Sequence, residues 1–503
     1  MESSNLVVVV DVGTSVTKAV LVSPQGVIDS TSQEYSVDYP QLGWAEQDPT
    51  RLANAITAST KELLERNSDA REKINGLTFT SQMSNVLPLD ENGNPLGPIM
   101  TWLDTRSAEI AEKVINSGWP KFKGYAVGKI LKFIKITGGG PSQTGKDPIS
   151  KLIWLKHEQP DLYAKTYKFV DNKDYAIFLA TGKFITSVDT AWVTWLMDSR
   201  EGGAKWSPDI FKMAHLDIGK MCEIKSSTDN IGSITPNFAA ATGLSEETNV
   251  ILGAGDLLAS AIGSGAVESG KLHANIGTAG WVAAHFEQNV RDLGHYTGAM
   301  ASAIPNMYLM LCKCETLGGA LEWAKTLFYG DADNAEIFPE IDNLVSQVEA
   351  GSGNIIFTPY LAGERAPIQD PKLRAQIFNL GLEHTRGHIL RAVFEGVAYN
   401  LRWGMELVEK LTKMPQNEVR LIGGGSKSDV WCQIFADVWQ KKVLQLKSPQ
   451  LASAVGAACI AFVGLGIFKD FKQVTDLIEV RKEFTPNPTN KPIYDKLYAE
   501  FPL

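Results

Sequence analysis

Residues 11–15 read Asp-Val-Gly-Thr-Ser and follow a run of β-branched residues. A second such run comes next, so the pattern predicts a strand, a tight turn and a returning strand. The backbone N–H groups of such a turn point into one concavity, and the hydroxyls of Thr14 and Ser15 add donors. The turn at Gly13 therefore suits phosphate oxygens, and Lys18 on the returning strand could meet a transferring phosphoryl group.

Asp11 ends an otherwise apolar strand, where an unpaired carboxylate would be costly. It could hold Mg²⁺, directly or through water, since Mg²⁺ prefers a few carboxylates together with phosphate and water. Alternatively, it could accept hydrogen bonds from the turn that follows. The residues themselves leave both interpretations open.

Two further glycine turns follow expected strands in the second half of the chain. Residues 271–286 repeat the first pattern, with a Gly-Thr pair at 277–278. Residues 423–425 are three glycines between an expected strand and an expected helix, where a ligand could approach the backbone without a Cβ in the way. A triple glycine alone could be only a flexible turn. Three glycine turns at strand ends together are a stronger indication of ligand binding.

Asp256 stands between a glycine turn and an apolar helical run. Asp at that position commonly caps the helix N-terminus. The partial positive charge of a helix N-terminus also keeps a carboxylate ionised at neutral pH. Asp256 could then act as a general base that accepts the proton of an attacking hydroxyl, a contribution of about 10²- to 10⁴-fold. Both roles could hold together.

Residues 140–147 have the spacing of a P-loop, Gly-x₄-Gly-Lys. A P-loop has Ser or Thr after its lysine to hold Mg²⁺, whereas here Asp147 follows and Pro148 comes next. A carboxylate at this place would repel phosphates. We therefore expect a mobile loop ahead of the helix that contains Lys151, and no phosphate site.

Short apolar runs alternate with longer amphipathic runs in both halves of the chain, as in α/β proteins. The patterns predict strands at 75–79, 354–359 and 419–422, and helices at 49–66, 107–115, from 151 to 158, 320–327, 388–411 and 428–440. The glycine hairpin repeated near the start of each half suggests two lobes of related architecture around a cleft, although two ordinary hairpins could share a turn sequence. We place the lobe boundary near Val250, with lobes of 1–250 and 251–503.

The composition is that of an ordinary globular protein. The 503 residues include 48 Lys+Arg and 57 Asp+Glu, a net charge of −9, which argues against nucleic-acid binding by counterion release. Five cysteines are too few for a disulfide scaffold, and no Cys or His spacing predicts a metal motif. Cys312 and Cys314 alternate in an apolar run and should share one face of a strand.

No targeting or membrane segment is expected. The apolar run before Asp11 is too short for a signal peptide. Residues 451–468 carry no charge and approach the lower length limit of a membrane span, but their Ala and Gly content favours a buried helix close to a neighbouring backbone. We expect a soluble, cytoplasmic protein without a membrane partner.

These motifs, taken in order, resemble the FGGY carbohydrate kinases of the actin-like and hexokinase-like ATPase superfamily. The resemblance runs from Asp11 to about Phe468. Within the family, the chain is most similar to the xylulokinase branch. The motifs that carry it are Asp-Val-Gly-Thr-Ser (11–15), Ser-Gln-Met (81–83), Trp-Leu-Asp-Thr-Arg (102–106), Lys-Leu-Ile-Trp-Leu (151–155), Gly-Ala-Gly-Asp (253–256), Gly-Thr (277–278), Gly-Glu-Arg-Ala-Pro (363–367), His-Ile-Leu-Arg-Ala-Val-Phe-Glu-Gly (388–396) and Gly-Gly-Gly (423–425).

The resemblance implies an α/β fold of two ribonuclease-H-like lobes around a central cleft, with ATP and Mg²⁺ as cofactors and a small sugar or polyol as substrate. It also implies that Asp256 is the catalytic base and that Asp11 organises the metal. The implied phosphate and nucleotide contacts are Gly13, Thr14, Ser15, Lys18, Gly277, Thr278, Gly423, Gly424 and Gly425. The implied substrate contacts are Gln82, Met83, Ser84, Trp102, Asp104 and Asp256.

The chain departs from the xylulokinase pattern at Ser84, where that branch typically has a His that touches the sugar. A ketopentose such as D-xylulose is the expected acceptor. Ribulose, another ketose, a polyol such as glycerol or erythritol, and a sugar acid such as gluconate are alternatives, which residues 82–85 would distinguish. An alternative of another class is an inactive, actin-like nucleotide-binding regulator, against which Asp11 and Asp256 together argue. A homodimer is possible.

Overall fold

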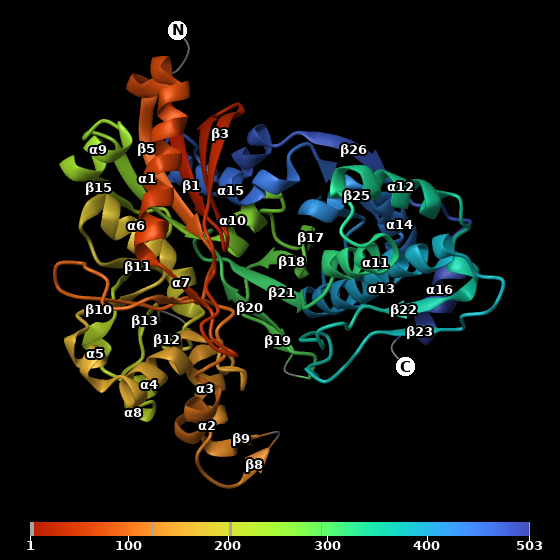
Figure 1. Cartoon of the computed structure of the whole chain (residues 1–503), viewed down its shortest axis with the longest axis horizontal. Coiled ribbons are helices and arrows are strands. Elements are labelled where there is room, and N and C mark those ends of the chain that lie inside the picture. The colour runs from red at the N-terminus through yellow and green to blue at the C-terminus, as the bar shows by residue number, and fades with distance from the viewer. Residues whose placement is uncertain (1–4, 123, 201–203, 293, 502–503) are drawn as a thin grey trace. The chain divides into compact units, whose positions relative to one another are not determined.

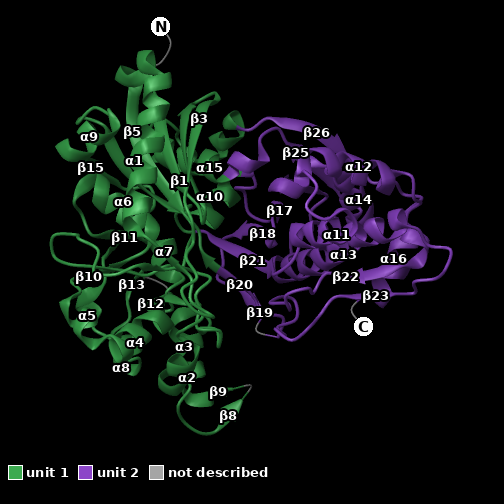
Figure 2. Ribbon diagram, viewed as in Figure 1, with its two compact units in different colours: residues 1–263, 300–306, 453–477 green, residues 264–299, 307–452, 478–503 purple. Residues whose placement is uncertain are grey.

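The computed structural model describes the chain except residues 1–4, 123, 201–203, 293 and 502–503. The chain divides into two compact units, which Figure 2 shows in green and purple. Unit 1 comprises residues 1–263, 300–306 and 453–477, and unit 2 comprises residues 264–299, 307–452 and 478–503. Each unit is built around a β-sheet of its own (Figure 1).

The sheet of unit 1 has six strands in the order β15-β16-β5-β1-β2-β3. Their bounds are β1 (Leu6–Val12), β2 (Val16–Ser23), β3 (Gly26–Glu34), β5 (Ile74–Ser81), β15 (Asn230–Ser233) and β16 (Asn249–Gly255). β1, β2 and β3 form an antiparallel meander. β5 then pairs in parallel with β1, and β16 pairs in parallel with β5, while β15 closes the edge antiparallel to β16.

Every residue of β1 is buried. Both faces of this sheet are therefore covered by other elements of the unit. The even-numbered residues of β1 pack into one hydrophobic core with α1, α6 and α9. On the opposite face, a Cβ on Gly76 of β5 would lie 2.7 Å from Leu465 and 3.5 Å from Val7. The helices of unit 1 are α1 (Pro49–Arg66), α2 (Ala108–Ile115), α3 (Val127–Thr137), α4 (Pro148–Glu158), α5 (Pro160–Lys165), α6 (Asn172–Thr181), α7 (Val188–Trp192), α8 (Pro208–Met213), α9 (Pro236–Thr242), α10 (Asp256–Gly263) and, from its second residue, α15 (Ala452–Gly464).

A second hydrophobic core of unit 1 lies among α2, α3, α4 and α8, outside the main sheet. Unit 1 also contains several short two-stranded sheets. Their strands are β4 (Glu46–Gln47), β6 (Leu87–Leu89), β7 (Ile99–Met100), β8 (Lys121–Phe122), β9 (Tyr125–Ala126), β10 (Lys168–Val170), β11 (Ile185–Ser187), β12 (Met197–Asp198), β13 (Lys205–Trp206) and β14 (Glu223–Lys225).

The main sheet of unit 2 has the strand order β19-β20-β21-β18-β17-β24-β25-β26, in which the last two residues of β20 belong to unit 1. The strands here are β17 (Leu272–Ile276), β18 (Gly280–Phe286), β19 (Arg291–Asp292), β20 (Thr297–Ala301), β21 (Tyr308–Cys314), β24 (Glu418–Ile422), β25 (Lys442–Leu446) and β26 (Val480–Phe484), with β22 (Ile356–Thr358) and β23 (Gln376–Phe378) as a separate pair. Cys312 and Cys314 are both buried in β21, with Lys313 less buried between them, which confirms the predicted shared face.

One long helix organises the core of unit 2. α13 (Arg386–Thr412) packs its buried residues against strands of the sheet and against α11, α12 and α14. The remaining helices of the unit are α11 (Gly318–Tyr329), α12 (Asn334–Ser346), α14 (Asp429–Trp439) and α16 (Lys491–Glu500).

The two sheets share one topology. In unit 1 the central order is β3-β2-β1-β5-β16, and in unit 2 it is β21-β18-β17-β24-β25. In both, three antiparallel strands are followed by two parallel ones, and an antiparallel strand closes the edge. The predicted α/β fold of two ribonuclease-H-like lobes is therefore confirmed, and the repeated glycine hairpins occupy the same place in each sheet.

The uncharged segment predicted as a buried helix forms α15. A Cβ on Gly456 of α15 would lie 1.8 Å from the carbonyl oxygen of Ala259 in α10. The two helix backbones thus approach each other at a point where only glycine fits. Within the described residues, none of the helices combines the length and apolarity needed to cross a membrane.

Gly456→Ala should destabilise the protein, because the added methyl would force α15 away from α10. We expect the free energy of unfolding to fall by about 3 kcal/mol, measured by urea denaturation. Gly128→Ala is the matched control. Gly128 is also a helical glycine of unit 1, but a Cβ there would meet nothing within 4 Å, so it should gain about 0.5–1 kcal/mol. Equal effects at the two positions would contradict the close helix contact.

Candidate active site

Three neighbouring strands of unit 1 end at the same edge of its sheet. β1 and β16 both flank β5 in parallel, with Val12 and Gly255 opposite Ser81 in the register. Asp11 precedes this point by one residue and Asp256 follows it by one. Since neighbouring strands lie about 4.8 Å apart, β1 and β16 are about 10 Å apart. The fold therefore brings the two predicted functional carboxylates to one edge, the usual location of ligands in α/β sheets.

Asp11 is a buried carboxylate, 8 % exposed. Ser453 of α15 donates its hydroxyl to Asp11 Oδ2 at 2.5 Å, and Lys18 is the cross-strand partner of Asp11 on β2. Burial raises the pKa of Asp11, while the Ser453 hydrogen bond and the charge of Lys18 oppose that rise. A cation at this carboxylate would favour its ionised form, so the residue suits a metal-organising role.

The first glycine turn is held from its carbonyl side. The Tyr35 hydroxyl donates to the carbonyl oxygen of Gly13, and the Tyr35 N–H donates to that of Ser15 at 3.0 Å. Between them, Gln47 Nε2 donates to the carbonyl oxygen of Thr14 at 2.6 Å. All three carbonyl groups are thus bonded to protein donors, and Ser15 is exposed. An anion-binding turn needs this arrangement, because it must present N–H groups rather than carbonyl oxygens.

A chain of side-chain hydrogen bonds joins this turn to the predicted substrate residues. Trp102 Nε1 donates to Thr14 Oγ1 at 3.2 Å, and Thr14 Oγ1 donates to Gln82 Oε1 at 2.9 Å. Gln82 Nε2 in turn donates to Gln47 Oε1 at 2.8 Å, which also accepts from Asn172 Nδ2 at 3.2 Å. The Thr14 hydroxyl, expected at phosphate, therefore links the turn to Gln82 and Trp102. The network fixes the orientation of the Gln82 amide.

Asp104 lies inside the unit rather than at its surface. It is fully buried, accepts the N–H of Ala45 at 2.8 Å, and forms a salt bridge with Arg106 at 2.6 Å. The Arg106 guanidinium also pairs with Glu46 at 2.7 Å and lies 3.5 Å from the ring centre of Trp44. Asp104 thus ties the segment before Gln47 to the Trp102 loop, and any contact with a sugar would compete with these bonds.

Asp256 is the first residue of α10 and is half-buried. Its Oδ1 accepts the N–H of Leu257 at 2.7 Å, a bond within the first turn of the helix. The preceding residue is fixed by Asp189, whose carboxylate accepts the Gly255 N–H at 2.8 Å. Met83 packs so closely here that a Cβ on Gly255 would lie 2.2 Å from its sulfur. The predicted base and the predicted substrate residue Met83 are therefore neighbours.

Ser84 adopts a left-handed backbone conformation, with φ of 71°. Its N–H donates to Asp171 Oδ2 at 2.9 Å, and its carbonyl oxygen accepts from Lys151 Nζ at 2.6 Å. Both partners are buried. The position at which the chain departs from the xylulokinase pattern is thus held by two charged side chains.

The P-loop-like segment lacks the strand that precedes a P-loop. α3 ends at Thr137 and α4 begins at Pro148, so no strand leads into residues 140–147. The predicted helix begins earlier than residue 151, because a proline in the first turn starts it. Asp147 accepts the Ser142 N–H at 2.7 Å and the Trp195 Nε1–H at 3.0 Å, so the loop is tied down rather than free.

Unit 2 repeats the arrangement of the first turn. β17 and β24 are parallel neighbours, so the turn after β17 and the glycines after β24 emerge at the same edge. The carbonyl of Thr278 accepts the N–H groups of Leu317 and Gly319 at 2.9 and 3.0 Å, and that of Gly277 accepts the Gly318 N–H at 2.8 Å. The turn carbonyls are again bonded to protein donors, here from the start of α11.

The three glycines after β24 differ in their surroundings. Gly423 has φ of 87°, and a Cβ there would lie 2.3 Å from Asn275 Oδ1. A Cβ on Gly425 would lie 2.4 Å from Ile276. Gly424 is exposed, and a Cβ there would meet nothing within 4 Å. The outer two glycines therefore allow close packing on β17, and the middle one faces open space.

Several residues of the site carry no local signal in the sequence. Tyr35 and Gln47 bind the turn, and Gln47 also accepts hydrogen bonds from Gln82 and Asn172. Asp189 binds Gly255, again from a distant part of the chain. Ser453 is the exception, because a hydroxyl near the start of an otherwise apolar helix is a recognisable departure from the pattern.

Among the described residues, no group of three or more His, Cys, Asp or Glu side chains could hold a metal ion. A site built from protein ligands alone is therefore absent from this part of the chain. Asp11 still fits the predicted Mg²⁺, because that ion uses one or two carboxylates together with phosphate oxygens and water.

Family models match most of the chain. The model of the FGGY carbohydrate kinase N-terminal domain matches residues 6–263, and that of the C-terminal domain matches residues 275–465. The chain belongs to the FGGY family of carbohydrate kinases. It is therefore a sugar kinase, and the alternative of a regulator without transfer activity is set aside.

Individual relatives agree with this assignment. A xylulose kinase of Bacillus subtilis is 29% identical over 98% of this chain and 95% of its own length, and a gluconokinase of the same organism is 27% identical over 95% and 91%. Among solved structures, the xylulose kinase of Rhodospirillum rubrum has a TM-score of 0.88 at 28% identity, covering 99% of this chain and 97% of its own. Gluconate kinase of Lactobacillus acidophilus has a TM-score of 0.87 at 27% identity, covering 99% and 96%.

Asp11→Asn should abolish most activity, by about a hundredfold or more, yet raise the Tm of the ligand-free FGGY kinase. Because folding raises the pKa of Asp11, the folded state binds a proton more tightly than the unfolded state. Wild-type stability is then lost as the pH rises from about 4 through the folded pKa, and the variant escapes this loss. Thermal unfolding at pH 5 and pH 8, without nucleotide or Mg²⁺, measures the difference.

Ser453→Ala is the control for Asp11→Asn. It keeps the carboxylate but removes its hydrogen bond, so it should lower the Tm at neutral pH. A lower Tm for Asp11→Asn at pH 8 would show that burial of the ionised carboxylate carries no cost.

Proposed function

We propose that this kinase transfers the γ-phosphoryl group of ATP to a hydroxyl of a ketopentose such as D-xylulose. The observation that carries the proposal is the placement of Asp256 at the N-terminus of α10, on the same sheet edge as Asp11 and the first glycine turn. A general base and a phosphate-binding turn on one edge are what phosphoryl transfer to an alcohol requires.

Asp256 acts as the base. It accepts the proton of the acceptor hydroxyl as that oxygen attacks phosphorus, and the bond to the leaving ADP breaks. The start of α10 favours its ionised form, and the bond from Gly255 to Asp189 fixes the backbone before it. Positioning of this kind supplies most of the catalysis in phosphoryl transfer.

Each unit has its own candidate phosphate contacts. In unit 1 we assign them to Gly13, Thr14, Ser15 and Lys18, and Asp11 would hold the Mg²⁺ of the nucleotide. In unit 2 we assign them to Gly277 and Thr278, with Gly423, Gly424 and Gly425 on the adenosine side. When bound, Mg²⁺ neutralises charge on the phosphoryl oxygens. The bonded carbonyl groups of both turns support this assignment.

We assign the acceptor contacts to unit 1, as the sugar-binding side of the protein. We assign them to Gln82, Met83, Ser84 and Trp102, next to Asp256. Asp104 supports these residues from the interior through Arg106 and Ala45. Relatives named xylulose kinase and gluconokinase differ by two percentage points in identity, 29% against 27%, so a sugar acid is the second candidate acceptor.

A screen for ADP release over pentuloses, hexuloses, polyols and sugar acids tests the proposal. We expect the highest kcat/KM with a ketopentose, and turnover at least about a hundredfold lower for Asp256→Ala, with little change in the KM for ATP. Equal folding of the variant is checked by circular dichroism.

Two results of this screen would contradict the proposal in different ways. A best acceptor among sugar acids or polyols would leave the kinase chemistry intact and replace the substrate. Turnover of Asp256→Ala within tenfold of the wild type would mean that another group is the base.

Gly424→Val should raise the KM for ATP by about tenfold or more and leave the KM for the sugar unchanged. The new side chain meets no protein atom within 4 Å of its Cβ, so the fold should not change, and an effect on ATP would come from the nucleotide itself. Isothermal titration calorimetry with ADP measures the change in nucleotide affinity directly. Unchanged ADP affinity would show that this loop does not contact the adenosine part of the nucleotide.

A further inference from the structure

The backbone at Ser84 is held in a conformation that the residue does not prefer. A non-glycine residue with φ of 71° occupies a sparsely populated region at a cost in free energy. The Ser84 hydroxyl forms no hydrogen bond with any described residue. A strained turn that directly follows Met83, which packs against Gly255, needs an interaction that maintains it.

Asp171 supplies most of that interaction. Its Oδ2 accepts the N–H of Ser84 at 2.9 Å and that of Asn85 at 3.3 Å, and its Oδ1 accepts Asn85 Nδ2 at 2.7 Å. The same Oδ1 caps the start of α6 through the Asn172 N–H at 2.7 Å. Both carboxylate oxygens thus bind the turn, and charge-assisted bonds of this kind are stronger than neutral ones.

Lys151 holds the turn from its carbonyl side. Its side chain is fully buried, and its ammonium donates to the Ser84 carbonyl oxygen at 2.6 Å. Burial lowers the pKa of Lys151 to about 8, and the nearby carboxylates of Asp104, Asp171 and Asp147 limit this decrease. Burying an ammonium group lowers the stability of the fold. Here the buried group fixes the position of the Ser84 carbonyl.

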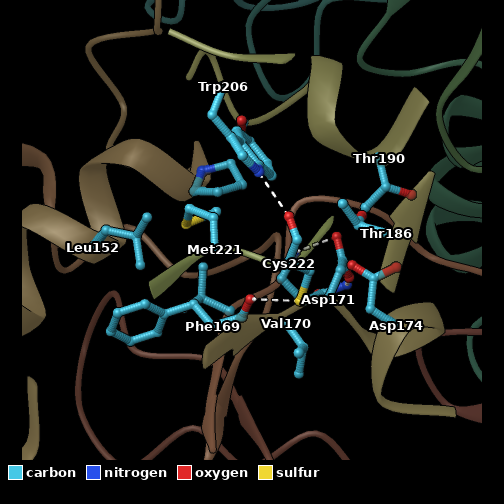
Figure 3. Close-up of a pocket in the computed structure, with 14 residues that line it drawn as sticks. Leu152, Phe169, Val170, Asp171, Asp174, Thr186, Thr190, Trp206, Met221 and Cys222 are labelled. Atoms are coloured by element: carbon cyan, nitrogen blue, oxygen red, sulfur yellow. Dashed lines mark hydrogen bonds between the residues drawn. The ribbon is translucent and has the colours of Figure 1, made fainter. Parts of the chain in front are cut away.

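The turn borders a small cavity at Asn85 and Asp171. A cavity of about 30 Å³ lies there, large enough for one water molecule. Asn85 lines it. Figure 3 shows Asp171, Asp174 and Cys222 among the other lining residues, all of unit 1. Ser84 does not line this cavity, and the side chains that bind its backbone are those of Asp171 and Lys151.

We propose that Asp171 and Lys151 are positioning residues that set the acceptor selectivity of this kinase by holding the Ser84 hydroxyl against the sugar. The inference rests on the proposed function, because it assumes that residues 82–85 line the acceptor site. Ser84 is shorter than the histidine typical of xylulokinases, so it reaches the sugar only if its backbone is placed accurately. A misplacement of about 1 Å can cost about a hundredfold in rate.

Asp171→Asn is the principal test. The amide has the same shape as the carboxylate but only one acceptor oxygen. Its NH₂ group would face N–H donors of Ser84 or Asn85, with which it cannot form a hydrogen bond. We expect the KM for the best acceptor to rise about tenfold and its advantage over the next acceptor to shrink, while the KM for ATP and the ATP hydrolysis without sugar stay within about twofold.

Asp174→Asn is the matched control. Asp174 lies in the first turn of the helix that Asp171 caps, is also buried and lines the same cavity, but its carboxylate pairs with Lys173 at 2.9 Å. This variant should lose stability without a change in acceptor KM. If both variants raise the acceptor KM equally, loss of stability rather than loss of positioning explains the effect, and the proposal is overturned.

Two further variants keep the test independent of the behaviour of Asp171→Asn. Lys151→Met removes the donor while keeping side-chain length and an apolar interior, and should also raise the acceptor KM. In a double-mutant cycle, Ser84→Ala should raise the KM in the wild type but add little to Asp171→Asn, since both act through one hydroxyl. Fully additive effects would show that Asp171 does not act through Ser84.

The outcomes separate this inference from the proposed function. A wild-type enzyme that phosphorylates no ketopentose would overturn the proposed acceptor, whatever the variants do. A wild-type enzyme that does so, with an unchanged acceptor KM and acceptor ranking in both Asp171→Asn and Lys151→Met, would overturn only the positioning role.

Discussion

The parallel pairing of β1, β5 and β16 is the constraint on which the rest of unit 1 depends. It puts Val12, Ser81 and Gly255 at one edge of the sheet, so the residues beside them are neighbours in space although up to 245 positions separate Asp11 from Asp256. Backbone hydrogen bonds fix the spacing between those strands. Sheet geometry therefore sets the distance between the phosphate turn and the base before any side-chain contact is made.

The second sheet repeats the same solution for the other phosphate turn. In both units a strand runs into a Gly-Thr turn, a second strand returns, and the turn carbonyls accept hydrogen bonds from elsewhere in the protein. The donors differ, since Tyr35 and Gln47 serve in unit 1 and the start of α11 serves in unit 2. A turn that must present N–H groups to phosphate needs its carbonyl groups bonded, and two unrelated sets of residues meet that need.

Three buried ionisable groups of unit 1 are either predicted site residues or bind one directly. Burial raises the pKa of Asp11, raises that of Asp171 to about 6 and lowers that of Lys151 to about 8, so the charged form of each group is disfavoured by the fold. Each lies at or directly behind the predicted site. Apolar residues of similar size would be less costly to bury, but they could not form the hydrogen bonds of Asp11 to Ser453 and of Asp171 and Lys151 to Ser84.

The sequence by itself determined the local elements and the residues with a strong local pattern. The helix at 49–66, the two glycine hairpins, the buried helix at 451–468 and the pair Asp11 and Asp256 all follow from periodicity, turn chemistry and isolated charge in apolar runs. These signals extend over a few residues, so they survive without knowledge of the fold. Family resemblance extended them to a sugar kinase.

Only the tertiary structure decided which side chains support those residues. Tyr35, Gln47, Asn172 and Ser453 lie between about 20 and 440 positions from the residues they bind, and no local pattern encodes such pairs. The sequence likewise did not predict that Asp104 is buried or that Asp171 and Lys151 bind the backbone of Ser84. These features depend on which segments the fold brings together. Long-range contacts are set by the packing of whole elements, and the sequence shows the elements but not their packing.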